Sequence, residues 1–166
     1  MSLFLVRLNC PILPPPRKST EELEKELLVE LLFEIGQKAE KVGYLCLLEP
    51  LNRHGTHLIN RLSDAVQICR KVNSPGVKVM ADFFHMNIEE KRIDEAIIEN
   101  GKFIYHIHLA DSNRLLPGCG HIDFKKGLRA LKQIGFDKYM AFECRISGDF
   151  DEEIPKSIDY LYQCME

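Results

Sequence analysis

Strand-like and helix-like segments alternate five times along this chain, and this alternation restricts the fold more than any other feature of the sequence. The strand-like segments are short and apolar, whereas the helix-like segments repeat apolar residues at intervals of three and four. The expected strands cover residues 4–9, 44–49, 77–82, 103–110 and 139–143, and the expected helices cover 19–42, 63–72, 88–99, 124–134 and 154–162. A repeated strand–helix unit predicts a parallel sheet with right-handed crossovers.

The first of these helices has the clearest boundaries. Ser19 and Glu22 have the spacing of a capping box, in which each side chain satisfies a backbone N–H group at the start of a helix. Gly43 stands where a glycine ends a helix in the left-handed conformation. Prolines at 14–16 exclude a regular element immediately before Ser19.

Two fold types contain repeated strand–helix units, the open doubly wound sheet and the closed barrel. No glycine follows the first expected strand in residues 10–14, so the sequence lacks the phosphate-binding loop of a nucleotide-binding open sheet. An eight-unit barrel uses about 31 residues per unit. The 166 residues therefore suffice for about five units, and we expect a single α/β domain over 1–166 that is a partial barrel.

Composition excludes several classes of protein. The net charge of −3 provides no basic surplus for general nucleic-acid binding. No apolar run approaches the roughly 20 residues of a membrane-spanning helix, and the first residues do not resemble a signal peptide. The six cysteines are scattered without a C-x-x-C pair, which indicates reduced thiols and a cytoplasmic location.

Ligand-type side chains stand at the carboxyl ends of four expected strands, one in each unit. They are Glu49, Asp82, His108 and Glu143. In folds of repeated βα units these strand ends form the functional face, so the four side chains are expected to meet there. Buried carboxylates are costly unless they are paired, protonated or bound to a metal. Three carboxylates and one imidazole favour Mn²⁺, Mg²⁺ or Co²⁺ over a thiolate-bound structural zinc.

Four blocks of the sequence resemble, in the same order, the signature blocks of the xylose isomerase-like family of sugar and sugar-phosphate isomerases and epimerases, which includes the ketose 3-epimerases. The blocks are Glu49–Arg53, Ala81–Glu90, His106–Arg114 and Pro117–Phe124. The resemblance extends from about residue 4 to 162. It implies the C-terminal part of a TIM barrel, with about five βα units present and roughly three N-terminal units lacking.

The resemblance also implies roles for individual residues. The four strand-end residues would bind one divalent cation, with Mn²⁺ preferred and Mg²⁺ or Co²⁺ as alternatives. His85 and Arg114 would contact oxygens of a small sugar or sugar-phosphate substrate. Glu49 and Glu143 would also transfer protons on opposite faces of the sugar, through an enediolate, which either inverts a centre or moves the carbonyl.

Two alternatives remain open at this point. Ketose epimerases of this family often have a substrate-contacting glutamate six residues after the first ligand, where this chain has Gly55. This difference bears on which sugar the chain would accept. Because roughly three N-terminal units that help line the sugar pocket in the family are lacking, the chain could instead be a truncated relative that binds metal without turnover. An apurinic endonuclease of the endonuclease IV type shares similar blocks, but it needs further histidines and a basic DNA surface. Since the first and last strands of a partial barrel are open edges, we also expect self-association that covers them.

Overall fold

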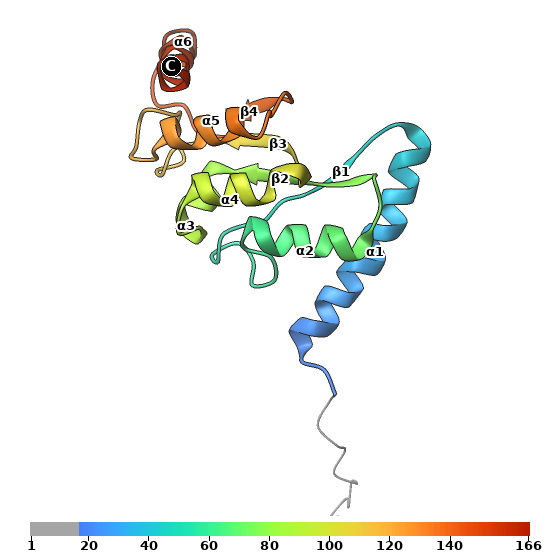
Figure 1. Ribbon diagram of the computed structural model, residues 1–166. Coiled ribbons are helices and arrows are strands. Elements are labelled where there is room, and N and C mark those ends of the chain that lie inside the picture. The colour runs from blue at the N-terminus through green and yellow to red at the C-terminus, as the bar shows by residue number, and fades with distance from the viewer. Residues whose placement is uncertain (1–16) are drawn as a thin grey trace, which may run out of the picture.

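The computed structural model describes residues 17–166, and its centre is a four-stranded parallel sheet in the order β1-β2-β3-β4 (Figure 1). The strands are β1 (Cys46–Leu48), β2 (Val77–Asp82), β3 (Ile104–Leu109) and β4 (Met140–Phe142). The helices are α1 (Thr20–Val42), α2 (Leu62–Val72), α3 (Phe83–Glu89), α4 (Ile93–Asn100), α5 (Phe124–Gln133) and α6 (Phe150–Met165), with a short 3-10 turn at Gly101–Phe103. The expected α/β fold of repeated units is confirmed.

Sequential strands are neighbours in the sheet, as a barrel requires. Val79 aligns with Leu48 of β1, and Asp82 of β2 aligns with His108 of β3, so the carboxyl ends of adjacent strands lie at the same edge. The expected strand at 4–9 lies outside the described residues, and the extent of the domain over 1–166 stays a prediction. Helices α2, α4 and α5 lie along the sheet, with α2 against α4 and α4 against α5 (Figure 1).

Helix α1 begins and ends as the sequence predicts. The Ser19 hydroxyl accepts a hydrogen bond from the N–H of Glu22 at 3.2 Å, and the Glu22 carboxylate accepts one from the N–H of Ser19 at 2.7 Å. Gly43 closes the helix at φ 73°. Two glycines bring α1 close to the start of β2, because a Cβ atom on Gly36 or Gly76 would clash with the opposing segment.

The prediction of a single helix at 88–99 is wrong, because two helices, α3 and α4, occupy this region. The Asp82 carboxylate accepts hydrogen bonds from the N–H groups of Phe84 and His85, which starts α3 directly after β2. Glu90 then adopts an extended conformation at φ −87° and ψ 140°, and α4 begins at Ile93. The apolar spacing continued across this break, so periodicity alone did not reveal it.

The last helix is longer than expected. Helix α6 begins at Phe150, four residues before the predicted start at 154, because Asp149 caps it by accepting from the N–H groups of Asp151 and Glu152. Pro155 lies within the helix. The apolar pattern resumes only after the acidic residues of the first turn, so the sequence predicted a later start of this helix.

The core between sheet and helices combines aliphatic side chains, mainly leucine, isoleucine, valine and alanine, with a few aromatic rings. Phe83 and Phe124 stack with ring centroids 5.3 Å apart and connect the start of α3 to the start of α5. Both rings are fully buried, as are Val79 and Ile107 on the central strands. The central strands are therefore fixed by packing, and their carboxyl ends have defined positions.

Two further expectations concern the whole chain. No helix among residues 17–166 combines the length and the apolar character that crossing a bilayer requires. The five cysteines of the described part are free thiols, and Cys10 lies outside the described residues. The cytoplasmic location stays a prediction.

Candidate metal centre

Four ligand-type side chains lie together at the carboxyl edge of the sheet. Glu49 directly follows β1, Asp82 ends β2, His108 is the penultimate residue of β3, and Glu143 directly follows β4. One ligand atom from each of the four lies within 4.8 Å of the others. The parallel register therefore brings these residues together as the strand-end pattern indicated.

The geometry within this cluster leaves room for an ion. His108 Nδ1 is 3.7 Å from Glu49 Oε1, 3.9 Å from Asp82 Oδ2 and 3.4 Å from Glu143 Oε2. Among the described residues, Glu49 Oε1 and His108 Nδ1 are the buried side-chain atoms without a hydrogen-bond partner. Buried polar atoms are normally satisfied, and leaving one unpaired costs about 1–3 kcal/mol. A divalent cation between them would satisfy both, so the residues fit such an ion.

The electrostatics of the cluster also favour a cation. Burial raises the pKa of Glu49, and the neighbouring carboxylates of Asp82 and Glu143 raise it further. Burial likewise raises the pKa of Asp82, although Arg114 opposes the rise. A bound cation would stabilise the ionised form of both carboxyl groups.

Arg114, one of the two expected substrate-binding residues, lies inside this cluster. Its Nη1 is 3.2 Å from Asp82 Oδ2, its Nη2 pairs with Glu143, and its guanidinium carbon lies 4.5 Å from the centre of the Phe84 ring. The backbone of Arg114 has a φ of 62°, an uncommon conformation for a residue other than glycine. The arginine therefore occupies a fixed position beside two of the carboxylates.

His85, the other expected substrate-binding residue, is held by the segment after β1. The backbone N–H of Asn52 donates to His85 Nδ1 at 3.1 Å. Since Nδ1 accepts this bond, the ring proton belongs on Nε2, and this N–H group has no acceptor among residues 17–166. Burial lowers the pKa of His85, which favours the neutral ring. The chain thus offers an oriented neutral donor next to Asp82.

Sequence reasoning missed the residue that organises the loop bearing Arg114. Asp111 is fully buried, and its carboxylate accepts hydrogen bonds from the N–H groups of Ser112 at 2.7 Å, Gly118 at 2.9 Å and Ile122 at 3.1 Å. Its carbonyl accepts from the N–H of Arg114 at 2.8 Å. An acidic residue just after a strand and before a glycine-containing loop is the signal that could have identified it.

A second missed residue is Glu89, which anchors the segment after β1. Its carboxylate accepts from the backbone N–H of Arg53 at 2.6 Å and from the Arg53 guanidinium at two positions 2.9 Å away. Arg53 follows Asn52, so this ion pair also fixes the donor to His85. The two residues are 36 positions apart in sequence, so no local pattern connects them.

The sequence from residue 4 to 164 matches the model of a family described as xylose isomerase-like TIM barrel. The chain belongs to this family. The expected relationship is therefore confirmed, and the partial sheet is part of the family's barrel.

Named members of the xylose isomerase-like family share substantial sequence with this chain. A 3-dehydro-D-guloside 4-epimerase of Escherichia coli K12 is 34% identical over 137 residues, which are 81% of this chain and 52% of the relative. A D-psicose 3-epimerase of Ruminiclostridium cellulolyticum is 39% identical over 118 residues, 71% of this chain and 40% of the relative. The chain thus spans about half or less of the length of these relatives.

Solved structures of the family agree with the described fold. The apo crystal structure of 3-keto-D-glucoside 4-epimerase from E. coli has a TM-score of 0.83 and 31% identity, covering 94% of this chain and 59% of that one. D-psicose 3-epimerase with D-tagatose, from Clostridium cellulolyticum H10, has a TM-score of 0.82 and 30% identity, covering 92% and 60%. The IOLI protein with a bound zinc atom has a TM-score of 0.68 and 26% identity, covering 90% and 57%.

Proposed function

We propose that this chain is a divalent-metal-dependent isomerase or epimerase of a small sugar or sugar phosphate. One observation carries the proposal: four ligand atoms from four strand ends lie within 4.8 Å of one another. Two of these residues contribute buried polar atoms without a hydrogen-bond partner in the described part of the chain. Such an arrangement is costly unless a cation joins the groups.

The proposed ion is Mn²⁺, with Mg²⁺ and Co²⁺ as alternatives. Glu49, Asp82 and Glu143 offer oxygen donors and His108 offers one nitrogen, a donor set that suits these ions. Zinc is the ion in the related IOLI structure. Zinc also accepts carboxylate and imidazole ligands, so it belongs among the ions to be compared.

The two glutamates are the proposed proton-transfer pair. When bound, the cation supplies Lewis-acid polarisation of the substrate carbonyl, which acidifies the neighbouring C–H group. Glu49 and Glu143 follow the two outer strands of the described sheet, β1 and β4, so they approach a substrate from different sides. One carboxylate removes the proton and leaves an enediolate, and the other carboxyl group returns a proton to the opposite face or to the adjacent carbon.

His85 and Arg114 are proposed to orient the sugar. The free Nε2–H of His85 can donate to a substrate oxygen, because Asn52 occupies its Nδ1. Arg114 pairs with both Asp82 and Glu143. When Glu143 turns toward the substrate, the Nη2 group of Arg114 becomes available to donate to a sugar oxygen or a phosphate.

The names of the relatives support a ketose-like substrate class. They include D-psicose 3-epimerases, L-ribulose 3-epimerases and a 3-dehydro-D-guloside 4-epimerase. All of these reactions invert a carbon next to a carbonyl group, which is the chemistry that a pair of carboxylates on opposite faces performs. We therefore extend this substrate class to the present chain as part of the proposal.

A second candidate function is metal binding without turnover. It is favoured by one observation, that the chain spans 52% and 40% of its two first relatives. Residues of the remaining half would contribute walls to the sugar pocket, and catalysis depends on accurate positioning of the substrate. Both candidates require the cluster to bind metal, so isotope exchange distinguishes them.

The test is solvent deuterium exchange. The full chain is stripped with a chelator, reloaded with Mn²⁺, and incubated with D-psicose, D-tagatose and L-ribulose in D₂O. We expect one Mn²⁺ per chain by elemental analysis and deuterium in the recovered sugar, with exchange lost in Glu49→Gln and Glu143→Gln. Glu152→Gln, at an exposed position on α6, serves as the matched control.

The outcomes separate the two candidates. Stoichiometric Mn²⁺ binding without exchange on any ketose supports the non-catalytic metal protein. Metal binding is also measured with Mg²⁺, Co²⁺ and Zn²⁺, and failure of the wild-type chain to bind any of these ions or Mn²⁺ contradicts both candidates. Exchange that persists in both glutamine variants contradicts the proposed proton-transfer pair.

A further inference from the structure

Two adjacent phenylalanines begin α3, and they face different surroundings. Phe83 is fully buried and stacks on Phe124 of α5, so it belongs to the core. Phe84 is only half-buried, and its ring lies against the guanidinium of Arg114 at the carboxyl edge of the sheet. Successive residues of a helix project about 100° apart, which directs the two rings differently. Packing of the core therefore accounts for Phe83 and leaves the position of Phe84 to be explained.

The ring of Phe84 contacts both side chains that are proposed to orient the sugar. The guanidinium carbon of Arg114 lies 4.5 Å from the centre of this ring. The imidazole of His85 meets the same ring edge-to-face, with centroids 5.4 Å apart and an interplanar angle of 72°. A guanidinium over an aromatic face and an edge-to-face pair of rings are both attractive arrangements. One ring thus connects the two side chains.

The backbone of Phe84 fixes the ring relative to the candidate metal centre. Its N–H group donates to the Asp82 carboxylate at 2.7 Å and so helps to cap α3. Every residue type except proline retains this N–H group. A substitution at position 84 therefore removes the ring but keeps the contact to Asp82, which separates the effect of the ring from that of the proposed metal ligand.

Arg114 needs a support besides its two carboxylate partners. It contacts Asp82 at 3.2 Å and pairs with Glu143. In the proposed function Glu143 turns toward the substrate, so its contact with the guanidinium is not permanent. A guanidinium released on one side keeps its orientation only where other contacts hold it. The buried carboxylate of Asp82 holds one end, and the ring of Phe84 holds the face.

We propose that Phe84 is a positioning residue, whose ring holds the Arg114 guanidinium and the His85 imidazole in the orientation that receives a sugar. This role rests on the proposed function, whereas the contacts of the ring do not. The ring neither donates nor accepts a proton, so it acts only through the two side chains beside it. Side chains that are oriented in advance lose less conformational freedom when a ligand binds. Loss of the ring should therefore weaken sugar binding more than it slows the chemical step.

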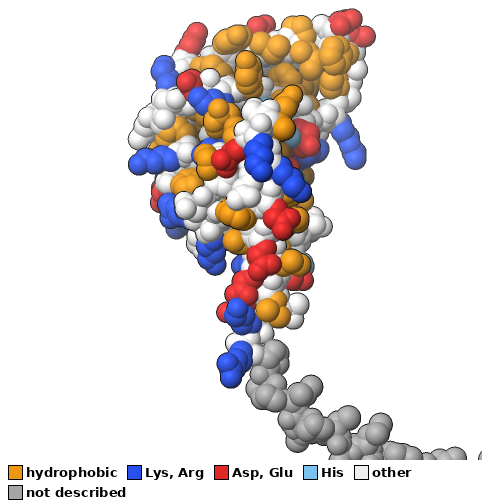
Figure 2. All heavy atoms as spheres, turned by 90° about the vertical axis from the view of Figure 1, so that its right-hand side faces the viewer, with side chains coloured by type: hydrophobic (Ala, Val, Ile, Leu, Met, Phe, Trp, Pro, Cys, Tyr) orange, Lys and Arg blue, Asp and Glu red, His pale blue; other side chains and the backbone are white. Residues whose placement is uncertain are grey.

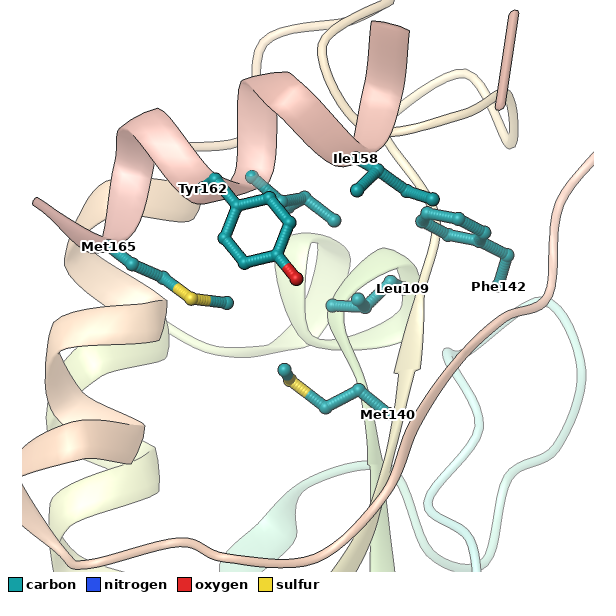
Figure 3. Close-up of a pocket in the computed structure, with 7 residues that line it drawn as sticks. Leu109, Met140, Phe142, Ile158, Tyr162 and Met165 are labelled. Atoms are coloured by element: carbon teal, nitrogen blue, oxygen red, sulfur yellow. The ribbon is translucent and has the colours of Figure 1, made fainter. Parts of the chain in front are cut away.

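Two other exposed aromatic side chains serve as matched controls. Tyr162 of α6 points into an apolar groove beside β4 (Figure 3). Phe33 belongs to α1, and Figure 2 looks onto this helix, where apolar side chains lie among charged ones. Among residues 17–166, no lysine or arginine lies over either of these two rings. Tyr162→Leu and Phe33→Leu therefore remove an exposed ring without removing a contact of this kind.

The first test is NMR of the metal-free full chain, which requires no activity. Phe84→Leu removes the ring, while leucine fills much of its volume and suits a helix; Phe84→Tyr keeps the ring. The Cδ protons of Arg114 are assigned by their loss in Arg114→Lys. We expect them at unusually high field in the wild type, because of the ring current, and also in Phe84→Tyr and both controls. In Phe84→Leu they should move to the ordinary arginine position.

The second test is deuterium exchange of the Mn²⁺-loaded protein as a function of sugar concentration, with D-psicose, D-tagatose and L-ribulose as probes. Phe84→Leu is expected to raise the half-saturating concentration about tenfold, the fold-change that corresponds to a contact of about 1.4 kcal/mol. The maximal rate should change little, because the ring takes no part in proton transfer. Phe84→Tyr and the two controls should match the wild type, and every variant should bind one Mn²⁺ per chain.

Three results would overturn the inference. One is a Phe84→Leu protein whose Arg114 signals equal those of the wild type, and another is an unchanged half-saturating concentration in that variant. The third is a Phe84→Tyr protein that behaves like Phe84→Leu in both tests. A wild type without exchange contradicts the proposed function instead, and the Arg114 signals then decide alone whether the ring positions the arginine. Circular dichroism of each variant excludes loss of folding as the cause.

Discussion

The guanidinium of Arg114 lies 3.2 Å from the buried carboxylate of Asp82, and so connects the loop after β3 to the end of β2. Asp82 is fully buried, and its carboxylate needs a nearby positive charge. Arg114 supplies this positive charge when no cation is bound. Arg114→Ala is expected to lower the stability of the metal-free protein by about 2 kcal/mol, the usual cost of unpairing a buried charged group. Urea unfolding of the chelated protein measures the loss.

The same variant should respond more strongly to metal. A cation would replace the lost positive charge, so added Mn²⁺ is expected to raise the melting temperature of Arg114→Ala more than that of the wild type. Arg129→Ala, at an exposed position on α5, should change stability by no more than about 0.5 kcal/mol. Equal metal responses of Arg114→Ala and the wild type would contradict this role of the arginine.

Glu49→Gln should have opposite effects on the metal-free and metal-loaded protein. Burial and two neighbouring carboxylates raise the pKa of Glu49, so its ionised form destabilises the metal-free fold. Removing the charge is expected to raise the metal-free melting temperature at neutral pH and to shrink the increase produced by Mn²⁺. Glu99→Gln, an exposed glutamate on α4, should change neither.

The pH dependence of this difference follows from the direction of the shift. A raised pKa in the folded state means that the folded protein holds the proton at pH values where the unfolded chain has lost it. Stability therefore falls as pH rises from the ordinary carboxyl range through the raised pKa of Glu49. The advantage of Glu49→Gln should appear over that range and vanish at lower pH. An advantage that is independent of pH would contradict this explanation.

Local patterns in the sequence were sufficient for much of the fold. The capping box at Ser19 and the glycine at 43 fixed α1 because both ends depend on contacts within a few residues. The strand-end pattern anticipated the cluster because parallel pairing aligns equivalent ends, as Asp82 and His108 show. These features required no knowledge of distant contacts.

Features that depend on distant contacts were not predictable. The break between α3 and α4 includes Glu90, whose carboxylate accepts from the N–H of Leu62, 28 positions away in sequence. Likewise, Asn52 reaches His85 over 33 positions. The spacing of hydrophobic residues indicates which face of a segment is buried. It does not indicate which backbone groups form hydrogen bonds with that segment.

Asp111→Asn should loosen the loop that presents Arg114. Burial alone would raise the pKa of Asp111. Hydrogen bonds to its carboxylate outweigh burial and lower the pKa; they come from the N–H groups of Ser112, Ile122, Gly120 and Gly118. An amide retains one acceptor oxygen and turns its NH₂ group toward backbone donors, so a loss of about 2 kcal/mol is expected. Because the folded pKa is lowered, the contribution of Asp111 is complete above the ordinary aspartate pKa and is lost as pH falls through the lowered one.

Hydrogen exchange measures this effect on the loop. The amides of Gly118 and Ile122 are expected to exchange faster in Asp111→Asn, while amides in α2 keep their protection. Asp159→Asn, at an exposed position on α6, is the control. Gly120→Ala should produce a similar loosening, since an added Cβ would clash with the Asp111 carboxylate. Unchanged exchange in both variants would exclude Asp111 as the organiser of this loop.

Glu89→Gln should change the ring tautomer of His85, although Glu89 does not contact His85. Glu89 holds Arg53 through its backbone and guanidinium, and the adjacent Asn52 donates to His85 Nδ1. Weakening the ion pair frees this segment, so the Asn52 bond no longer fixes the proton on Nε2. Nitrogen NMR of the ring is expected to show one tautomer in the wild type and a mixture in Glu89→Gln.

Acid should reproduce the effect of this variant. The hydrogen bonds from Arg53 lower the pKa of Glu89, so the ion pair is intact at neutral pH and is lost as pH falls through that lowered value. Burial lowers the pKa of His85 and favours its neutral ring, so the tautomer comparison is made near neutral pH. The acid effect is followed through the Arg53 amide signal. Glu95→Gln, which removes only an exposed contact to Arg92 at 3.3 Å, should leave both signals unchanged. A single Nε2–H tautomer in Glu89→Gln would mean that Asn52 is positioned by its own turn, through its contacts with the N–H groups of residues 54–56, and not by the ion pair.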